Sequence, residues 1–316
     1  MSSSASFTPD EDSIYNAEKF FDLVVAAYPS ELGQRVSAAE REKRSLFDTP
    51  LTYGEAAFAA LAITFQKIKR FYGGLRSRGG RFVDVGSGVG KAVFAAALLH
   101  DWDSCVGVEL LEDLAAVSRT ILARWKELVA AEELPRAART SSIDFCDGDA
   151  CAVDWGSDAD FLFMNSTCFS DAMMLRLVTV ADRMKAGSWA VTFTKRLPSH
   201  DWAVLESQPF EQTWGGSATI FIHRKLASAA PAAALVGVTG GLAKLAHRDK
   251  KAEAAAAKKK LEEFRANASA TWIRKPAGPP AVDLSTIETR DPLEALMGPN
   301  YTSASLALDF SAKPQN

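Results

Sequence analysis

The stretch between Arg81 and Glu109 constrains the fold of this chain more than any other. It holds a short apolar run, a glycine-rich turn, an Ala-rich apolar run and a second short apolar run that ends in an acid. Strand, turn, helix, strand and acid form the first half of a nucleotide-binding α/β unit. Glycines let the backbone approach a ligand closely, and the start of a helix offers unpaired N–H groups. The candidate ligand-binding residues of this stretch are Asp84, Gly86, Ser87, Gly88, Gly90, Lys91 and Glu109.

Several ligands compete for this pattern. A phosphate-binding loop needs G-x-x-x-x-G-K followed by Ser or Thr, but Val85 holds the first glycine position and Ala92 the last. A dinucleotide fold needs G-x-G-x-x-G, and Asp84 beside the turn would repel a pyrophosphate. An aspartate suits a ligand with an amino group and a sulfonium charge. S-adenosyl-L-methionine has both, and D-x-G-x-G-x-G typically opens a class I methyltransferase. A tight turn that binds nothing is the remaining alternative.

Apolar periodicity predicts a βαβαβαβαβ order followed by an antiparallel hairpin. The expected fold class is α/β: a class I methyltransferase, Rossmann-like sheet of seven mostly parallel strands, with an antiparallel C-terminal hairpin and a helical N-terminal extension. Beyond the opening unit, strands are expected at 142–146, 160–164 and 189–194, and the hairpin at 210–214 and 219–224. Helices are expected at 14–27 after a Ser13 cap, 37–46, 55–72, 92–99, 112–129 and from a Ser170 cap to 184.

Polar side chains stand at the predicted carboxyl ends of four strands. They are Asp84, Glu109, Asp149 and Asn165. Ligands of open α/β sheets bind beyond these ends. We therefore expect the four side chains to meet in one ligand-binding site.

Composition divides the chain into segments. We predict a helical extension with a cofactor-covering loop at 1–54, a catalytic domain at 55–226, a low-complexity linker and basic helix at 227–275, and a Pro-rich disordered tail at 276–316. Formal net charge is −3, yet the segment from Lys244 to Lys275 alone carries +6. The four cysteines lack C-x-x-C spacing, so we expect reduced thiols in an intracellular protein and no metal site. No run has membrane-spanning length, and no signal peptide is evident.

Three separated segments resemble one family. They are T-Y-G-E (52–55), D-V-G-S-G-V-G with G-V-E (84–90 and 107–109), and F-M-N-S-T-C-F (163–169); T-W-G-G followed by I-F-I-H (213–223) is a weaker match. Together they resemble the disruptor-of-telomeric-silencing family, the non-SET histone-lysine methyltransferases. The resemblance spans about residues 46–224 and is more specific than the glycine turn alone.

The resemblance implies roles for individual residues. Tyr53 and Glu55 would close over the methionine half of the cofactor, and Asp84, Gly86 and Gly88 would line its amino-acid portion. Glu109 would hold the ribose hydroxyls, and Asp149 would meet the adenine. Asn165 would sit where the methyl passes, with Phe169 and Trp214 walling a lysine channel. Packing alone is the alternative for Tyr53, Phe169 and Trp214.

The chain departs from the family pattern at several positions. Ser166 and Thr167 stand where the family has a second Asn and a Phe. Lys91 replaces a Gln, Ala56 a Thr, and Ala150 a Phe expected to stack on adenine. Phe221 stands where a channel tyrosine is expected. These changes bear on the substrate more than on the cofactor.

The resemblance implies a histone-lysine methyltransferase that uses S-adenosyl-L-methionine on nucleosomes in the nucleus, with the cytoplasm as the alternative location. The basic segment from Lys244 to Lys275 fits non-specific contact with DNA phosphates, and a solvated helix without a partner is the alternative. Two other functions stay open: methylation of another protein or a small molecule, and a catalytically silent module that binds the cofactor or chromatin. The sequence does not predict an oligomeric state.

Overall fold

A seven-stranded sheet in the order β3-β2-β1-β4-β5-β7-β6 lies at the centre of the computed structural model. The structure describes residues 7–46, 51–75, 78–211 and 217–227. The strands are β1 (Arg81–Val85), β2 (Ser104–Glu109), β3 (Ser142–Asp147), β4 (Phe161–Met164), β5 (Trp189–Phe193), β6 (Trp202–Glu211) and β7 (Ser217–Lys225).

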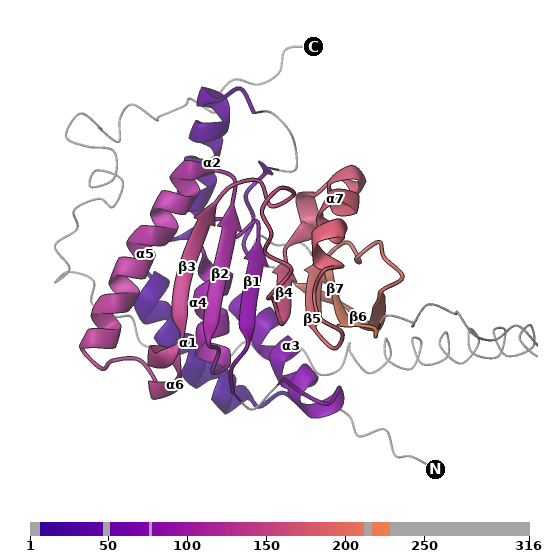
Figure 1. The fold of residues 1–316 in the computed structure, drawn as a ribbon. Coiled ribbons are helices and arrows are strands. Elements are labelled where there is room, and N and C mark those ends of the chain that lie inside the picture. The colour runs from indigo at the N-terminus through magenta and orange to yellow at the C-terminus, as the bar shows by residue number, and fades with distance from the viewer. Residues whose placement is uncertain (1–6, 47–50, 76–77, 212–216, 228–316) are drawn as a thin grey trace, which may run out of the picture. The chain divides into compact units, whose positions relative to one another are not determined.

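The first five strands are parallel, and β7 and β6 add an antiparallel pair at one edge. In Figure 1 the arrowheads of β1, β2 and β3 point toward the same end of the sheet. The strand order reverses at β1, because β2 and β3 lie on one side of it and β4 and β5 on the other. Such a reversal leaves a crevice at the carboxyl ends of the central strands. The predicted fold class is confirmed.

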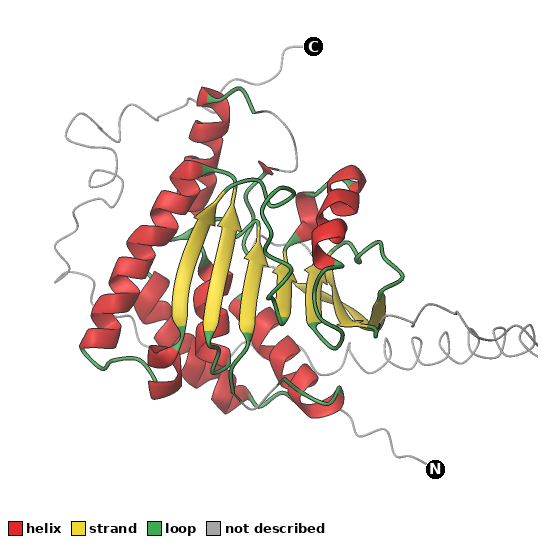
Figure 2. Cartoon of the chain, in the orientation of Figure 1, coloured by secondary structure: helices red, strands yellow, loops and turns green. Residues whose placement is uncertain are grey.

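Helices cover the sheet (Figure 2). They are α1 (Glu11–Val25), α2 (Ser30–Lys43), α3 (Phe58–Phe71), α4 (Lys91–Leu99), α5 (Glu112–Ala130), α6 (Arg136–Thr140) and α7 (Asp171–Ala181), with a 3-10 turn at Ser166–Cys168. Helix α4 is apolar along nearly its whole length, which suits a helix packed between the sheet and other helices: it contacts β1 and β2 as well as α1 and α3.

Two separate layers of apolar side chains hold the sheet. On one face an aromatic group joins Phe65 of α3 to Phe82 and Phe161 of the central strands, with the rings of Phe65 and Phe161 5.0 Å apart. Val83 and Leu162 belong instead to a cluster that includes residues of α7. Alternation along each strand therefore gives both faces an apolar surface, as a buried parallel sheet requires. The central strands are fixed in position, and so are the residues at their ends.

Several predicted boundaries were wrong. Helix α1 begins at Glu11, because the Asp10 side chain caps it and accepts a hydrogen bond from the backbone N–H of Ser13. Helix α2 begins seven residues before the predicted Ser37. Strand β6 starts at Trp202, well before the predicted 210, because its long pairing with β7 extends across a bulge near Val204. No helix connects β3 to β4 in the described chain, and the short α6 was not predicted.

Among the described residues, no helix is both long enough and apolar enough to cross a membrane. The domain boundaries at residues 54, 226 and 275 stay predictions. The basic segment from Lys244 to Lys275, the Pro-rich tail and Trp214 lie outside the described residues.

Candidate functional site

A cavity of about 330 Å³ opens at the carboxyl ends of the central strands. Its walls come from β1, β2 and β4, from the start of α4 and from the segment at residues 51–56, which we call the covering segment. Twelve of the residues predicted from sequence line it: Tyr53, Glu55, Asp84, Gly86, Ser87, Gly88, Lys91, Glu109, Asp149, Ala150, Asn165 and Phe169. Residues far apart in the chain therefore meet in one cavity, including the four polar strand-end residues.

Two predicted residues do not line the cavity, and Trp214 is not described. Gly90 precedes α4 with a φ of 82°, and a Cβ there would lie 2.4 Å from the Phe145 ring. Its role is to let the helix begin close to β3. Phe221 lies on β7 between partners on β5 and β6, with its ring 6.1 Å from that of His223. Phe221 was predicted at the position of a channel tyrosine, and that role stays a prediction.

Asp84 is the least satisfied charged group of the cavity. It is 2% exposed, and no described residue donates a hydrogen bond to its carboxylate. Burial, followed by repulsion from Glu109, raises its pKa well above the ordinary value. Buried carboxylates are normally paired or hydrogen-bonded, so an unpaired one facing a cavity is suited to bind a cationic ligand.

Glu109 lies at the end of the neighbouring strand in a different environment. Its Oε1 accepts hydrogen bonds from the backbone N–H groups of Leu110 and Leu111, both at 2.9 Å, and its Oε2 accepts from Gly88 at 2.7 Å. Burial raises its pKa, and these three bonds oppose that rise. A carboxylate has about four acceptor positions, so about one remains, on Oε2. Glu109 therefore fixes the glycine turn and keeps room for one ligand hydroxyl.

Asp149 is more exposed than Asp84 and Glu109, with 41% of its side chain accessible. The backbone N–H of Cys151 donates to its carboxylate at 2.8 Å, and Arg176 of α7 lies 3.1 Å away. The Cys151 hydrogen bond, aided by Arg176, lowers the pKa of Asp149. Its neighbour Ala150 is buried in the apolar cluster beneath the cavity. This end of the cavity thus combines a fixed acid with an apolar floor.

The covering segment is tied down by a network of polar side chains. The Tyr53 hydroxyl donates to Glu55 at 2.5 Å, and Lys91 forms an ion pair with Glu55 at 2.8 Å. Ser30 of α2 also donates to Glu55. Burial and the neighbouring Glu55 raise the pKa of Tyr53, so its hydroxyl keeps its proton. The Tyr53 ring also occupies the space next to Gly88, where a Cβ would lie 2.6 Å from it.

Asn165 links the covering segment to the strand ends. Its Nδ2 donates to the carbonyl of Gly54 at 3.0 Å, and its Oδ1 accepts from the hydroxyl of Thr167 at 2.8 Å. Phe169, 8% exposed, lies against the glycine turn, since a Cβ at Gly86 would be 3.0 Å from its ring. Phe169 therefore packs in the core and lines the cavity at once.

Sequence reasoning missed three contributors to the site. Thr167 was noted only as a departure from the family pattern, although it follows Asn165 closely and orients it. Ser30 lies between the helices predicted at 14–27 and 37–46 and was given no role. Glu40 of α2 is 3% exposed and accepts hydrogen bonds from the backbone N–H groups of Glu112 and Asp113. It caps α5 from a distant helix, and no local motif signals such a cap.

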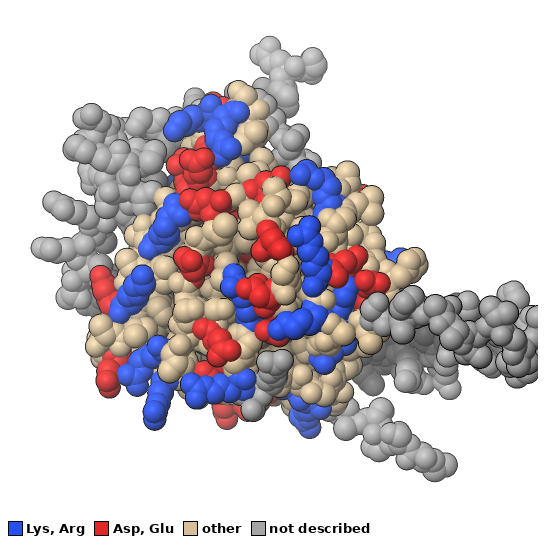
Figure 3. All heavy atoms as spheres, in the orientation of Figure 1, with Lys and Arg blue, Asp and Glu red and all other residues tan. Residues whose placement is uncertain are grey.

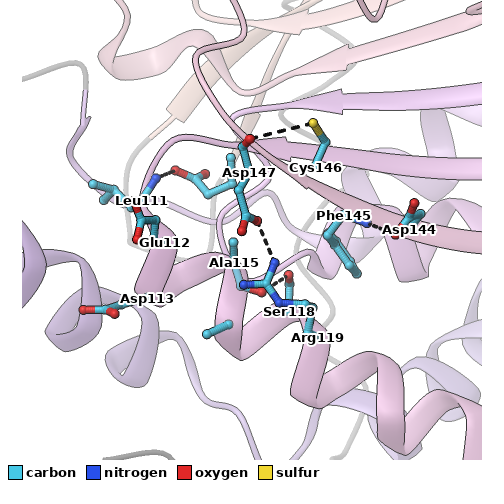
Figure 4. Close-up of polar contacts among 12 residues, drawn as sticks. Leu111, Glu112, Asp113, Ala115, Ser118, Arg119, Asp144, Phe145, Cys146 and Asp147 are labelled. Atoms are coloured by element: carbon cyan, nitrogen blue, oxygen red, sulfur yellow. Dashed lines mark hydrogen bonds and ion pairs between the residues drawn. The ribbon is translucent and has the colours of Figure 1, made fainter. Parts of the chain in front are cut away.

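Figure 4 shows the start of α5 together with the end of β3. Arg119 of α5 pairs with Asp147 of β3 at 2.6 Å, and the backbone N–H of Leu111, just before α5, donates to Glu109. Helix α5 is thus held at its first turn by Glu40 and at its second by Asp147. The start of α5, which follows β2, is therefore tied to α2 and to β3.

The family model described as histone methylation protein DOT1 matches residues 38–208. This segment is more than half of the 316 residues and contains every residue that both lines the cavity and was predicted from sequence. The chain belongs to the DOT1 histone methylation family. Trp214 and Phe221 lie beyond the end of the DOT1 match.

The chain is also similar to several solved structures that are distant in sequence. TrmN from Thermus thermophilus is 19% identical over 54% of this chain and 52% of that chain, with a TM-score of 0.40. The TrmK tRNA methyltransferase of B. subtilis is 13% identical over 54% and 67%, with a TM-score of 0.38. A Haemonchus contortus N-methyltransferase, solved with S-adenosylhomocysteine, is 21% identical over 48% and 30%, with a TM-score of 0.32.

This chain therefore spans about half the length of TrmN. No curated protein matches the sequence. The fold assignment rests on the order and direction of the strands.

Proposed function

We propose that this DOT1-family protein is a histone-lysine N-methyltransferase that uses S-adenosyl-L-methionine. The observation that carries the proposal is Asp84: a buried carboxylate without a hydrogen-bond donor among the described residues, beside a glycine turn and within a cavity. An anionic nucleotide phosphate would be repelled there, whereas the ammonium and sulfonium groups of this cofactor would be attracted. Family membership supplies the class of substrate.

The residues of the cavity fit the parts of the cofactor. Asp84 would face its cationic groups, and the remaining acceptor position of Glu109 would take one ribose hydroxyl. Lys91 lies at the first position of α4, where the helix dipole adds positive potential. It would therefore balance the carboxylate of the methionine portion, with Glu55 as its partner in the free protein. The buried, apolar Ala150 would lie under the adenine.

When bound, the cofactor supplies a methyl group that its sulfonium already activates for transfer. The protein then has to align the acceptor amine and to keep it neutral. A lysine amine has an ordinary pKa near 10.4. Apolar walls such as Phe163 and Phe169 lower that pKa by desolvation, and a nearby positive charge lowers it further. Alignment alone can contribute about 7–11 kcal/mol to such a reaction. A dedicated general base is therefore not required, and Asn165 is placed to orient the amine.

The substrate we propose is a histone lysine within the nucleosome, which places the protein in the nucleus. The face in Figure 3 carries acidic and basic side chains interspersed, and so gives DNA no continuous positive surface. We propose that attraction to DNA phosphates comes from the basic segment between Lys244 and Lys275, which carries +6.

Transfer of a radiolabelled methyl group tests the function. Purified full-length protein is incubated with labelled S-adenosyl-L-methionine and with nucleosomes, free histones or lysate proteins in parallel, and Asp84→Asn serves as the matched control. We expect label on a histone lysine in the nucleosome sample, and much less label with the variant at cofactor concentrations below its Kd. Label only on non-histone protein would overturn the substrate assignment. Cofactor binding without transfer to any sample would indicate a silent binding module.

A further inference from the structure

A strained turn follows β5 beside the cavity. Thr194 has a φ of 66°, which a β-branched residue rarely adopts. Its backbone N–H donates to the carbonyl of Thr219 at 2.7 Å, and the N–H of Lys195 donates to the carbonyl of Phe193 at 2.7 Å. Glycine or asparagine would adopt this conformation at lower cost. Thr194 therefore carries a backbone strain that glycine would not carry.

Buried hydroxyl groups hold this turn in place. Thr192 donates to the carbonyl of Lys195 at 2.6 Å, and the buried Ser166 hydroxyl reaches the carbonyls of both Phe193 and Lys195. Ser166 is one of the two residues that depart from the family pattern after Asn165. Its contact with the turn gives that departure a structural role. Backbone strain persists only where surrounding contacts enforce it in this way.

The Thr194 hydroxyl begins a series of side-chain hydrogen bonds in which each donor can be assigned. Thr194 Oγ1 lies 3.0 Å from Thr167 Oγ1, which lies 2.8 Å from Asn165 Oδ1. The Asn165 oxygen can only accept, so Thr167 gives its single proton to it. Thr194 must then be the donor to Thr167. At the other end, Asn165 Nδ2 faces the carbonyl of Gly54, which can only accept. The donor and the acceptor of each hydrogen bond in this chain are therefore assigned.

We propose that Thr194 is a positioning residue, which acts through Thr167 to orient the Asn165 amide and to hold Gly54 and the covering segment over the cavity. One N–H of the amide remains for a ligand, because the other is held by Gly54. The inference rests on the proposed function for its catalytic consequence. The structural link from Thr194 to the covering segment does not depend on that function.

Three substitutions separate this role from a purely structural one. Thr194→Val keeps the shape and removes the hydroxyl, Thr194→Ser keeps the hydroxyl, and Thr194→Gly removes both the hydroxyl and the strain. Thr120→Val is the matched control, since the Thr120 hydroxyl only contacts a carbonyl within α5. Each variant is compared with wild type in thermal unfolding, in amide hydrogen exchange of residues 51–57, and in methyl transfer to nucleosomes.

We expect Thr194→Val to speed exchange of the covering segment and to lower kcat, each about five- to tenfold, with little change in the KM of the methyl acceptor. Thr194→Ser should restore both values. Thr194→Gly should unfold at a higher temperature than wild type and yet show the same losses as Thr194→Val. Thr120→Val should behave as wild type.

Wild-type exchange and kcat in Thr194→Gly or Thr194→Val would overturn the proposal. If wild type transfers no methyl group at all, the proposed function fails. In that case, amide hydrogen exchange of the covering segment still tests the proposed role of Thr194. Faster exchange in Thr194→Val and recovery in Thr194→Ser would support it, and equal exchange in all variants would refute it.

Discussion

Asp84 and Glu109 end neighbouring parallel strands and are both buried, yet they have opposite hydrogen-bond environments. Three backbone N–H groups donate to Glu109, whereas no described residue donates to Asp84. Glu109 therefore stabilises the folded protein and offers a ligand about one acceptor position. Asp84 costs the free protein stability and leaves its whole carboxylate to a ligand. The comparison shows how one end of a sheet can separate a structural acid from a binding acid.

Replacing Glu109 should have the largest effect. Glu109→Ala leaves three buried N–H groups without an acceptor, so we expect a loss of about 3 kcal/mol or more in the free energy of unfolding. Glu109→Gln keeps one side-chain oxygen, which can still accept two of the three hydrogen bonds. This variant should therefore lose less free energy of unfolding than Glu109→Ala. Chemical denaturation of the two variants and wild type measures the difference. Equal, small losses in both variants would mean that the glycine turn does not depend on this carboxylate.

Glu40 tests whether a saturated carboxylate outside the cavity acts on stability alone. Glu40→Ala removes the cap of α5 and should lower the free energy of unfolding by about 1–2 kcal/mol. Affinity for S-adenosylhomocysteine should stay within about twofold of wild type, since Glu40 does not line the cavity. Denaturation and calorimetry on the same preparation give both values. A large loss of affinity would show that α2 is part of the binding site.

Replacing Asp84 should have effects opposite to those of Glu40→Ala: higher stability and weaker cofactor binding. Asp84→Asn removes a buried carboxylate whose folded-state pKa is raised. Such a group weakens the folded state as pH rises through its raised pKa, so the variant should gain stability over wild type from acid to neutral pH. It should also bind S-adenosyl-L-methionine about 10- to 100-fold more weakly. Thermal scans over a pH series follow the stability. A less stable variant would contradict the unpaired environment of Asp84.

The pH dependence of binding is a smaller effect. A cationic ligand lowers the raised pKa of Asp84, so binding releases a proton and affinity rises with pH, by at most about tenfold per pH unit. Affinity for S-adenosylhomocysteine measured at several pH values should show this slope in wild type. Asp84→Asn should show a flatter one. The same slope in both proteins would assign the proton to another group.

Deletion of residues 244–275 should change nucleosome binding and should not change ligand binding in the cavity. Nucleosome binding should weaken and lose part of its salt dependence, because fewer DNA counterions are released. Affinity for S-adenosylhomocysteine should not change. Binding in a salt series, with and without the segment, measures the effect. An unchanged salt slope would remove this segment from the interface.

Much of the fold could be predicted from the sequence, because the glycine turn and the apolar strands are local signals. The meeting of Asp84, Glu109, Asp149 and Asn165 followed from their places at strand ends. Their different hydrogen-bond environments could not be predicted. They depend on how the backbone turns after β2, where two N–H groups point back toward Glu109.

Long-range contacts explain the other features that could not be predicted from the sequence. The cap that Glu40 provides joins residues 72 and 73 positions apart. The chain from Thr194 through Asn165 to Gly54 needs three distant segments in register. The pairing that places Phe221 of β7 between β5 and β6 also joins distant segments, and its role in a lysine channel stays a prediction. Sequence patterns record such pairings poorly.

Isothermal titration calorimetry tests the central claim, that Asp84 is held unpaired for a cationic ligand. S-adenosyl-L-methionine and S-adenosylhomocysteine are titrated into folded wild type and Asp84→Asn at neutral pH, in two buffers of different ionisation enthalpy. We predict that wild type binds both ligands and releases a proton, and that Asp84→Asn binds weakly without that release. Folded wild type that gives no binding heat with either ligand, or a variant that binds as tightly as wild type, would contradict the account.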